Sequence, residues 1–403
     1  MPKAIYTAEQ VKRLDRIAID EFGIPGYELM CRAGEAALGA LRSRWPDARR
    51  LAILCGAGNN AGDGYVLARL AHERGLEVRA VAVVPTDRLG GDAKRAWQDY
   101  QGQGGKVESF SPDCILSEDV VVDGLLGVGL ARELEGDLLA AVQRINSAGR
   151  PVLALDIPTG LHADTGLVLG TAVAAELTIT FVGLKRGLFL GNALDYRGTL
   201  EFSGLAIPAQ AYDRVPACME RLTAEILKGL LLPRARTAHK GRNGSLLLVG
   251  GAPGMSGAIR LAAEAALRAG AGLVRVATHP ESVDSVMAGR AEVMCQGTST
   301  PEALEKLLVV SDAVVLGPGL GQSDWAKRVW GQILASELPV VVDADGLNLL
   351  SEIRQTRENW ILTPHPGEAA RLLRTDTETV QADRLGAALR LAGAYGGVAV
   401  LKG

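Results

Sequence analysis

Short apolar runs alternate with amphipathic helical stretches through most of the chain. In the first half these runs are continuous rather than alternating. Continuous runs indicate strands buried on both faces, and such strands joined by helices form parallel sheets. A helix with a capping-box pattern precedes them, because Thr7 is followed three residues later by Gln10. We predict strands at Leu51–Cys55, Val78–Val84, Val120–Val122, Val152–Leu155 and Leu177–Val182.

A second series of apolar runs follows a looser stretch that contains three prolines. Pro208, Pro216 and Pro233 interrupt the pattern there, as expected of a segment between domains. We therefore expect two α/β domains, residues 1–210 and 236–403, with residues 211–235 as the linker region. The second series predicts strands at Ser245–Val249, Leu273–Ala277, Ala313–Leu316, Val340–Asp343, Trp360–Leu362 and Val398–Leu401.

Length and composition agree with two cytoplasmic globular domains. The 403 residues are too many for one ordinary hydrophobic core. The net charge is −3 without a basic stripe, so nucleic acid is not expected as a partner. No apolar segment approaches the length of a membrane span, so no membrane association is expected. The cysteines lack CxxC spacing, which argues against a disulfide framework or a zinc site and favours a reducing compartment; they are Cys31, Cys55, Cys114, Cys218 and Cys295.

The loop Gly56–Gly64 joins the first predicted strand to a predicted helix and is rich in glycine and asparagine. Glycines let the backbone approach a ligand closely, and a helix N-terminus offers free N–H groups to a phosphate. The spacing GxGxxxG is not the dinucleotide fingerprint. An ordinary turn capped by Asn or Asp is the alternative, but two asparagines and an aspartate exceed what one cap requires. The loop therefore indicates a binding site for a nucleotide-like ligand.

Two further predicted strands end in acidic, glycine-rich segments. Asp123 follows the run Val120–Val122 and leads into a glycine-rich loop with Arg132 nearby, and Asp156 follows Val152–Leu155. Any one of these aspartates could be a helix cap. Because ligands of open α/β sheets bind at the carboxyl ends of the strands, we expect the three segments to converge on one site.

Together, the segments GAGNNAGDG (56–64), VVDGLLGVGL (121–130) and LDIPTG (155–160) resemble the NAD(P)H-hydrate epimerase domain, the YjeF N-terminal family, over the first half of the chain. The resemblance implies a Rossmann-like three-layer sandwich that acts on a hydrated dinucleotide, NADHX or NADPHX. It makes Asp156 the acid/base group. Lys185 is a further catalytic candidate, with a surface lysine as the alternative. Thr159 stands where the family usually carries Ser, a change that keeps the hydroxyl and the carbonyl.

The same resemblance implies ligand roles for individual loop residues. A potassium ion is implied, held by the oxygen ligands of Asn60, Asp123 and Thr159. A non-catalytic domain that only binds the nucleotide is the alternative. Contacts with the hydrated dinucleotide are implied for Asn59, Asn60, Ala61, Gly62, Asp63, Gly127, Val128, Gly129, Leu130, Ala131, Arg132, Glu133 and Asp156.

Five segments of the second half resemble the ADP/ATP-dependent NAD(P)H-hydrate dehydratase, which has a ribokinase-like α/β fold. They are HKGRNG (239–244), GGAPGMSGA (250–258), GPGLG (317–321), DADGLN (343–348) and LTPHPGE (362–368). His365 lies between two prolines in this last segment, and a purely structural histidine is the alternative to a substrate contact. A sugar or vitamin kinase is the alternative function for this half. The resemblance implies ADP or ATP with magnesium, nucleotide contacts from Lys402 and Gly403, and substrate contacts from Ala258, Gly319, Gly321 and His365.

The two resemblances imply a bifunctional enzyme of metabolite repair. The first domain would interconvert the R and S epimers at C6 of NADHX and NADPHX, and the second would use ADP or ATP to dehydrate the S epimer to NAD(P)H. In the family, Leu401-Lys402-Gly403 leads into the nucleotide loop and later into a glycine-rich helix start with the catalytic Asp. We therefore expect the C-terminal part of the second domain to be missing and its dehydratase activity to be incompetent. A homo-oligomer is also expected.

Overall fold

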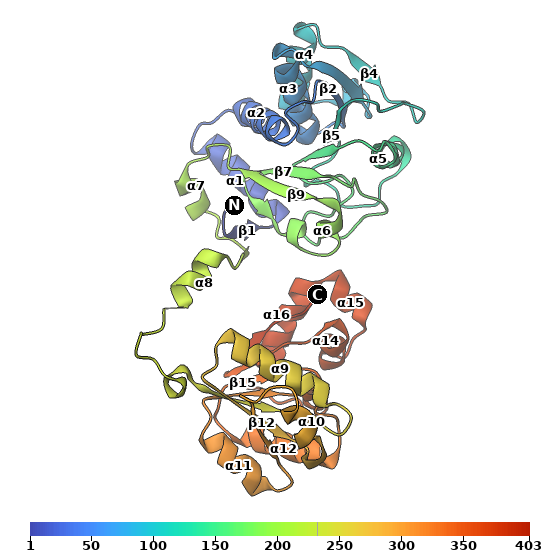
Figure 1. Ribbon diagram of the computed structural model, residues 1–403. Helices are drawn as coiled ribbons and strands as arrows, with labels where there is room; N and C mark the ends of the chain where they lie inside the picture. Colours follow the sequence, from blue (N-terminus) through green and yellow to red (C-terminus); the bar gives the residue numbers. More distant parts are fainter. Residues whose placement is uncertain (232) are drawn as a thin grey trace. The chain divides into compact units, whose positions relative to one another are not determined.

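The computed structural model of the protein describes residues 1–231 and 233–403. Residue 232, which falls in the expected linker region, lies outside the described residues. After Leu231 the chain divides into two compact units, the first beginning at Met1 and the second ending at Gly403 (Figure 1). None of the helices in the described part of the chain is long and apolar enough to cross a membrane.

The first unit is built on a parallel sheet of seven strands. The five strands predicted from apolar runs are all present, each within a few residues of its predicted bounds. The two edge strands were not predicted, because VES is short and polar and TLEFS mixes polar with apolar residues. In spatial order the strands are β4 (Val107–Ser109), β3 (Glu77–Ala82), β2 (Arg50–Cys55), β5 (Val120–Gly124), β6 (Val152–Leu155), β7 (Leu177–Phe181) and β9 (Thr199–Ser203).

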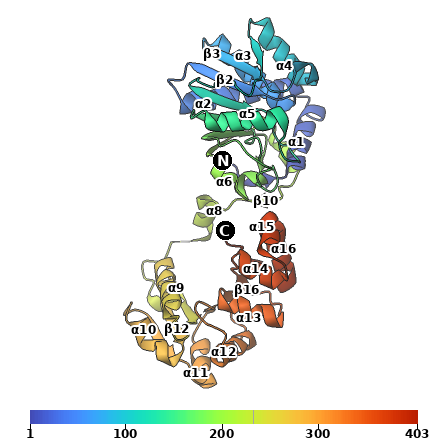
Figure 2. The same cartoon turned by 90° about the vertical axis from the view of Figure 1, so that its right-hand side faces the viewer.

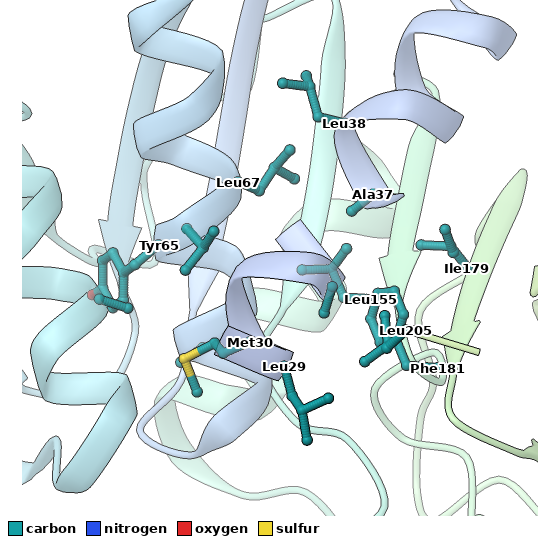
Figure 3. Packing of buried hydrophobic residues seen from close by; sticks show 14 of the residues in the cluster. Leu29, Met30, Ala37, Leu38, Tyr65, Leu67, Leu155, Ile179, Phe181 and Leu205 are labelled. Carbon is teal, nitrogen blue, oxygen red and sulfur yellow. The ribbon is translucent and has the colours of Figure 1, made fainter. Parts of the chain in front are cut away.

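Helices cover both faces of this sheet, and the longer ones are α1 (Ala8–Asp20), α2 (Gly26–Arg44), α3 (Asn59–Glu73), α4 (Gly91–Gly102) and α5 (Gly136–Ser147). The odd-numbered core residues of β2 pack in a cluster with α1 to α4, and the even-numbered ones pack in a cluster with α5. Figure 3 shows part of the first cluster, with Leu38 and Leu67 of two helices facing Leu155 and Ile179 of two strands. The expected three-layer α/β sandwich is confirmed.

A small second sheet lies in the same unit and contains the N-terminal strand. β1 (Ala4–Tyr6) pairs in antiparallel fashion with β10 (Met219–Glu220) and in parallel with β8 (Leu184–Lys185). In the second pairing Tyr6 lies opposite Lys185. β10 falls within the expected linker region, and its pairing with β1 ties this part of the segment to the first unit.

Helix α1 begins with the capping box that the sequence predicts. The Thr7 hydroxyl accepts a hydrogen bond from the Gln10 N–H at 3.1 Å, and the Gln10 side-chain oxygen accepts one from the Thr7 N–H at 2.8 Å. These two bonds satisfy N–H groups that a helix start otherwise leaves free. Leu14 and Ile17 are buried on the side of α1 that faces the core.

The second unit also contains a seven-stranded parallel sheet, and all six strands predicted for it are present. The seventh strand, MCQG at one edge, was not predicted because it lacks a continuous apolar run. In spatial order the strands are β13 (Met294–Gly297), β12 (Leu273–Thr278), β11 (Ser245–Val249), β14 (Ala313–Leu316), β15 (Val340–Val342), β16 (Trp360–Leu362) and β17 (Val398–Ala399).

This sheet is also covered on both faces. Alternate residues of β11 enter two clusters: Leu248 packs with α9 (Ser256–Ala269) and α10 (Val283–Met287), and Leu247 packs with the helices of the other face. Figure 2 shows α9 and α10 on one side of the sheet and α13 and α14 on the other. The helices of the second cluster are α12 (Asp324–Ala335), α13 (Asp345–Ile353), α14 (Pro366–Leu373), α15 (Thr377–Ala382) and α16 (Arg384–Tyr395).

Candidate functional site

The three strand-end segments of the first unit meet at the carboxyl edge of its sheet. β5 pairs with β2 on one side and with β6 on the other. Gly127, in the loop after β5, lies against both neighbouring segments. A Cβ added there would lie 3.4 Å from Asp156 Oδ2 and 3.6 Å from the Asn60 side chain. The predicted convergence of these segments is therefore confirmed.

These segments border a cavity of about 490 Å³, a volume typical of small-molecule sites. Two groups of the predicted epimerase residues lie elsewhere: Ala61 and Gly62 are buried in α3, and residues 130–133 fall outside the lining. Their contact with substrate stays a prediction. The predicted residues that line the cavity are Asn59, Asn60, Asp63, Gly127, Val128, Gly129, Asp156 and Lys185.

Asp156 and Lys185 form a buried ion pair in this cavity. The Lys185 ammonium donates to Asp156 Oδ1, to the Thr180 hydroxyl at 3.0 Å and to the Phe181 carbonyl at 2.8 Å. Its side chain is 1% exposed, so the surface-lysine alternative is wrong. Asp156 has a φ of +66°, a conformation that is sparsely populated for residues other than glycine and concentrated at functional sites. The Phe181 N–H also donates to its carboxylate, at 3.3 Å.

Asp123 and Thr159 form a second buried polar pair beneath the loops. Thr159 donates its backbone N–H to Asp123 Oδ2 at 2.8 Å and its hydroxyl to Oδ1 at 2.8 Å, and the Leu125 N–H donates to Oδ1 at 3.2 Å. Complete burial raises the pKa of Asp123 to about 6, although these hydrogen bonds act to lower it. The pair fastens the loop after β6 to the end of β5.

Asn60 is the most unusual polar residue of the cavity. It is 7% exposed, and within the described part of the chain neither its amide oxygen nor its amide nitrogen has a hydrogen-bond partner. Burying an amide without partners costs free energy, so such groups in native proteins point to an unseen ligand. With the carboxylate of Asp123 and the oxygens of Thr159, its amide oxygen makes a set suited to a hard cation.

Sequence reasoning missed the residues that α1 and α2 bring to the cavity. Asp15 and Lys12 reach it from α1, and Leu29 and Met30 reach it from α2. A signal was present for Asp15, which lies one turn after Val11 on the face of α1 that carries the apolar residues. Nothing in the local sequence indicates that this face meets the strand ends rather than a purely apolar core.

Burial raises the pKa of two further carboxyl groups among those that line the cavity, Asp15 and Asp63. It raises the pKa of Asp15 to about 6; the Lys185 ammonium opposes this rise and the Asp156 carboxylate adds to it. Burial also raises the pKa of Asp63 well above its ordinary value, with further contributions from Asp156 and Asp15. Burial thus favours the protonated form of both groups more than water does, and a carboxyl group of raised pKa is suited to act as a general acid.

In the second unit, the loops after β11 and β14 pack against the start of α9. The Gly251 N–H donates to the Pro318 carbonyl at 3.1 Å, which joins the two loops. Gly319 has a φ of +60°, and a Cβ there would lie 2.5 Å from the Met255 carbonyl oxygen and 3.4 Å from Ala258 Cβ. The predicted residues Gly319 and Ala258 are thus brought together, by an approach that requires glycine.

The loops after β14, β15 and β16 are joined by side chains. The Gly321 N–H donates to Asp345 Oδ2 at 2.8 Å. The Lys402 ammonium donates to Asp343 Oδ1 at 2.6 Å, and its backbone N–H donates to the Pro364 carbonyl at 2.9 Å. The predicted nucleotide residue Lys402 therefore lies at the same sheet edge as the predicted substrate residues. Gly403 follows it beside the Arg384 side chain, and its nucleotide contact stays a prediction.

His365 is the N-cap of α14. Its Nδ1 accepts hydrogen bonds from the Gly367 N–H at 2.9 Å and the Glu368 N–H at 3.3 Å, and Glu368 Oε2 accepts the His365 N–H at 2.8 Å. The ring thus has a structural role. Its side chain is 51% exposed, with Nε2 3.5 Å from Glu368 Oε1, and its contact with substrate stays a prediction.

Comparison with known proteins links both units to one family of bifunctional proteins. Residues 26–187 match the family described as YjeF-related protein N-terminus, and residues 246–403 match the family described as NAD(P)H-hydrate dehydratase. The bifunctional NAD(P)H-hydrate repair enzyme of Coxiella burnetii is 47% identical over 99% of this chain and 82% of the relative. The corresponding enzyme of Escherichia coli is 43% identical over 100% of this chain and 78% of the relative. The chain belongs to the bifunctional NAD(P)H-hydrate repair enzymes.

Solved structures resemble parts of this repair enzyme. The ADP/ATP-dependent NAD(P)H-hydrate dehydratase of Bacillus subtilis matches with a TM-score of 0.39 and 28% identity, over 45% of this chain and 65% of that one. A ribokinase-like superfamily protein of Enterococcus faecalis matches with a TM-score of 0.42 and 28% identity, over the same shares. Membership of the repair-enzyme family decides against the sugar or vitamin kinase as the activity of the second unit.

The first family match begins at residue 26, after two elements that complete the site of this repair enzyme. α1 carries Asp15 and Lys12, and β1 pairs with the strand that carries Lys185. The N-terminal segment therefore belongs to the site as much as the three glycine-rich loops do.

The Thr159 hydroxyl is expected to be needed for the stability of the first unit. Thr159→Val removes a donor to a fully buried carboxylate, so we expect the free energy of unfolding to fall by about 1.5–3 kcal/mol, the range for hydrogen bonds to charged groups. Chemical denaturation followed by circular dichroism measures the change. Thr159→Ser, which keeps the hydroxyl, serves as the control and should lose much less. Equal stability of the Val variant and the wild type would contradict the assigned role.

Proposed function

We propose that the first unit epimerises the R and S forms of NADHX and NADPHX in the cavity at its strand ends. We assign to the second unit the dehydration of the S form to NAD(P)H with ADP or ATP and magnesium, and the expectation that this chain is incompetent in that step stays a prediction. Family membership supports both activities. The observation that carries the epimerase assignment is the buried pair of Asp156 and Lys185 in a cavity that also contains the unpartnered Asn60. A cytoplasmic location and a homo-oligomer stay predictions.

Asp156 is suited to transfer a proton to or from the oxygen atom bound at C6 of the hydrated ring. The ammonium of Lys185 and the N–H of Phe181 donate hydrogen bonds to its side chain, which keeps 14% exposure and lines the cavity. The left-handed backbone holds the carboxylate in place over the loop that contains Gly127. A positioned base of this kind contributes about 10²–10⁴-fold to a rate.

The N-terminus of α3 is suited to the phosphates of the dinucleotide. The helix begins at Asn59, and the residue before it is Gly58, which has no side chain that could cap the free N–H groups. A phosphate can take their place, because a helix N-terminus carries partial positive charge. The lining residues Gly127 and Gly129 leave room beside this end of the helix.

We propose a potassium ion at the unpartnered amide of Asn60, beside the cavity that this residue lines. Asn60, Asp123 and Thr159 would hold it, and its charge would stabilise the buried carboxylate and the amide oxygen that lacks a partner. Asp123 and Thr159 already fasten two of the loops to each other, and Asn60 belongs to the third. The ion would thus order the loops on which the substrate lies.

The second unit supplies the proposed dehydratase site at its own strand ends. Ala258, Gly319 and Gly321 form the surface on which the hydrated ring would lie, with His365 beside it. Lys402 would contact the nucleotide, with Gly403 next to it. The hydrogen bonds and the ion pair that join the loops after β11, β14, β15 and β16 support this arrangement.

Asp156→Asn is expected to lower kcat for epimerisation at least about 100-fold, because the amide cannot accept a proton. Chromatographic separation of the R and S hydrates over time measures the rate. The matched control is Asp137→Asn at an exposed position of α5, which should leave the rate unchanged. Full epimerase activity of the Asp156 variant would exclude the proposed mechanism, whereas bound substrate without turnover would rule out the purely binding alternative.

Epimerisation is expected to depend on potassium through Asn60. We expect the wild type to be several-fold faster in potassium than in a bulky organic cation at equal ionic strength. Asn60→Ala should abolish this difference, because it removes the unpartnered amide oxygen. Asn192→Ala, at an exposed position, is the control and should respond like the wild type. Equal wild-type rates in both salts would refute the cation proposal and leave the proton-transfer role of Asp156 standing.

Substitutions at His365 distinguish its role as the N-cap of α14 from its proposed contact with substrate. Asn is a good N-cap, so His365→Asn should keep the thermal stability of the second unit, whereas His365→Ala should lower it. If the ring contacts the hydrated nicotinamide, both variants should bind S-NADHX about tenfold more weakly than the wild type. Isothermal titration calorimetry measures this affinity and does not depend on turnover. Wild-type affinity of His365→Asn for S-NADHX would leave the residue as a cap alone.

A further inference from the structure

Asp15 enters the epimerase cavity from α1 and has no assigned role. Its carboxylate is half-buried and lines the cavity together with Asp63, Asp156 and Lys185. Among the described residues, no group donates a hydrogen bond to the carboxylate of Asp15 or of Asp63, although both lie in a site that binds polar ligands. The buried, unpartnered amide of Asn60 in the same lining independently points to a ligand here.

The contacts of the two lysines that line the cavity leave Asp15 without an ion-pair partner. The Lys185 ammonium, which is the buried positive charge of this cavity, is fully used by Asp156, Thr180 and the Phe181 carbonyl. Lys12 also lines the cavity, one turn before Asp15 on α1, but it is exposed and well solvated. A half-buried carboxyl group without a cation or a donor favours its protonated form.

Other acidic groups lie near Asp15. Asp156 lies at the end of β6 and Asp63 on α3, and Asp92 of α4 also lines the cavity. Tyr212 of α7 (Ala209–Asp213) also faces Asp15, but its hydroxyl donates to the Val182 carbonyl at 2.7 Å and is not available. Burial, with Asp156, accordingly raises the pKa of Asp15 to about 6.

We propose that Asp15 is a second acid/base residue of the epimerase cavity, which donates a proton where Asp156, paired with Lys185, accepts one. The inference rests on the proposed epimerase function and deepens it. The two groups reach the cavity from different elements, Asp15 from α1 and Asp156 from the end of β6. Two acid/base groups allow a proton to be delivered on one side of a ring and removed on another.

The proposed step is balanced in atoms and electrons. The Asp15 carboxyl gives its proton to the C6 hydroxyl, the C–O bond breaks with its electron pair on oxygen, and water leaves. The lone pair of the ring nitrogen forms the C=N bond that replaces it. Water then adds to the other face of C6, the C=N pair returns to nitrogen, and Asp156 takes the proton. No oxidant or reductant is needed, and cavity water returns the proton to Asp15.

The pH dependence of epimerisation in Asp15→Asn tests this assignment in the full-length chain. In the wild type, kcat should fall as pH rises through the pKa of Asp15, because the protonated form is lost. Asp15→Asn should lower kcat about 100-fold, with KM changed by less than about threefold, and should remove this pH limb. Asp15→Glu should restore most of the rate. Asp20→Asn, at an exposed position of the same helix, is the control and should match the wild type.

Thermal stability separates this role from a structural one. A carboxyl group whose pKa is raised on folding costs stability above that pKa, so Asp15→Asn should keep or raise Tm at neutral pH. A lower Tm with a parallel loss of activity in Asp15→Asn would overturn the proposal, and so would a wild-type rate with the pH limb intact. If Asp156→Asn is inactive while Asp15→Asn is fully active, the epimerase function stands and this inference fails. A wild-type chain that epimerises neither NADHX nor NADPHX overturns both.

Discussion

The buried ion pair between Asp156 and Lys185 is the interaction on which the first site depends. Removing an ammonium group from water costs several kcal/mol unless its hydrogen bonds are replaced. Here a carboxylate, a hydroxyl and a carbonyl replace them, and they come from the end of β6 and from β7. The strand of Lys185 is in turn held by pairing with β1. The pair therefore forms only when the N-terminal segment and the ends of the main sheet are all in place.

That pair also sets the chemistry of its neighbours. Because Asp156 takes the ammonium, Asp15 and Asp63 are left in a half-buried cavity without a cation, and burial raises the pKa of each. A protein selected only for stability would not keep unpaired carboxyl groups and the unpartnered Asn60 at one place. Their presence together is the physical mark of a site that binds a polar ligand and transfers protons.

The second unit reaches a comparable arrangement by other means. Its strand-end loops are joined by backbone hydrogen bonds, by the ion pair of Lys402 with Asp343 and by a glycine, Gly319, at a position where any side chain would strike the Met255 carbonyl. In the second unit, close approach of backbone segments thus holds the loops of the site together, as buried charged groups do in the first unit. Both sites lie at the carboxyl edge of a parallel sheet, where helix starts and strand ends leave backbone groups free for ligands.

The sequence by itself determined the central strands of both sheets, the division into two α/β units, the three glycine-rich segments of the first site and the family. These features are local, because apolar runs and glycine spacing can be identified in the sequence without knowing which residues they contact in the fold. Only the tertiary structure decided that Lys185 is buried, that Asp15 reaches the cavity, and that His365 caps a helix. Each of these depends on contacts between segments or on side-chain direction, as the pairing of β1 with β8 shows. Periodicity reports which face of an element is buried, but it does not report what that face is buried against.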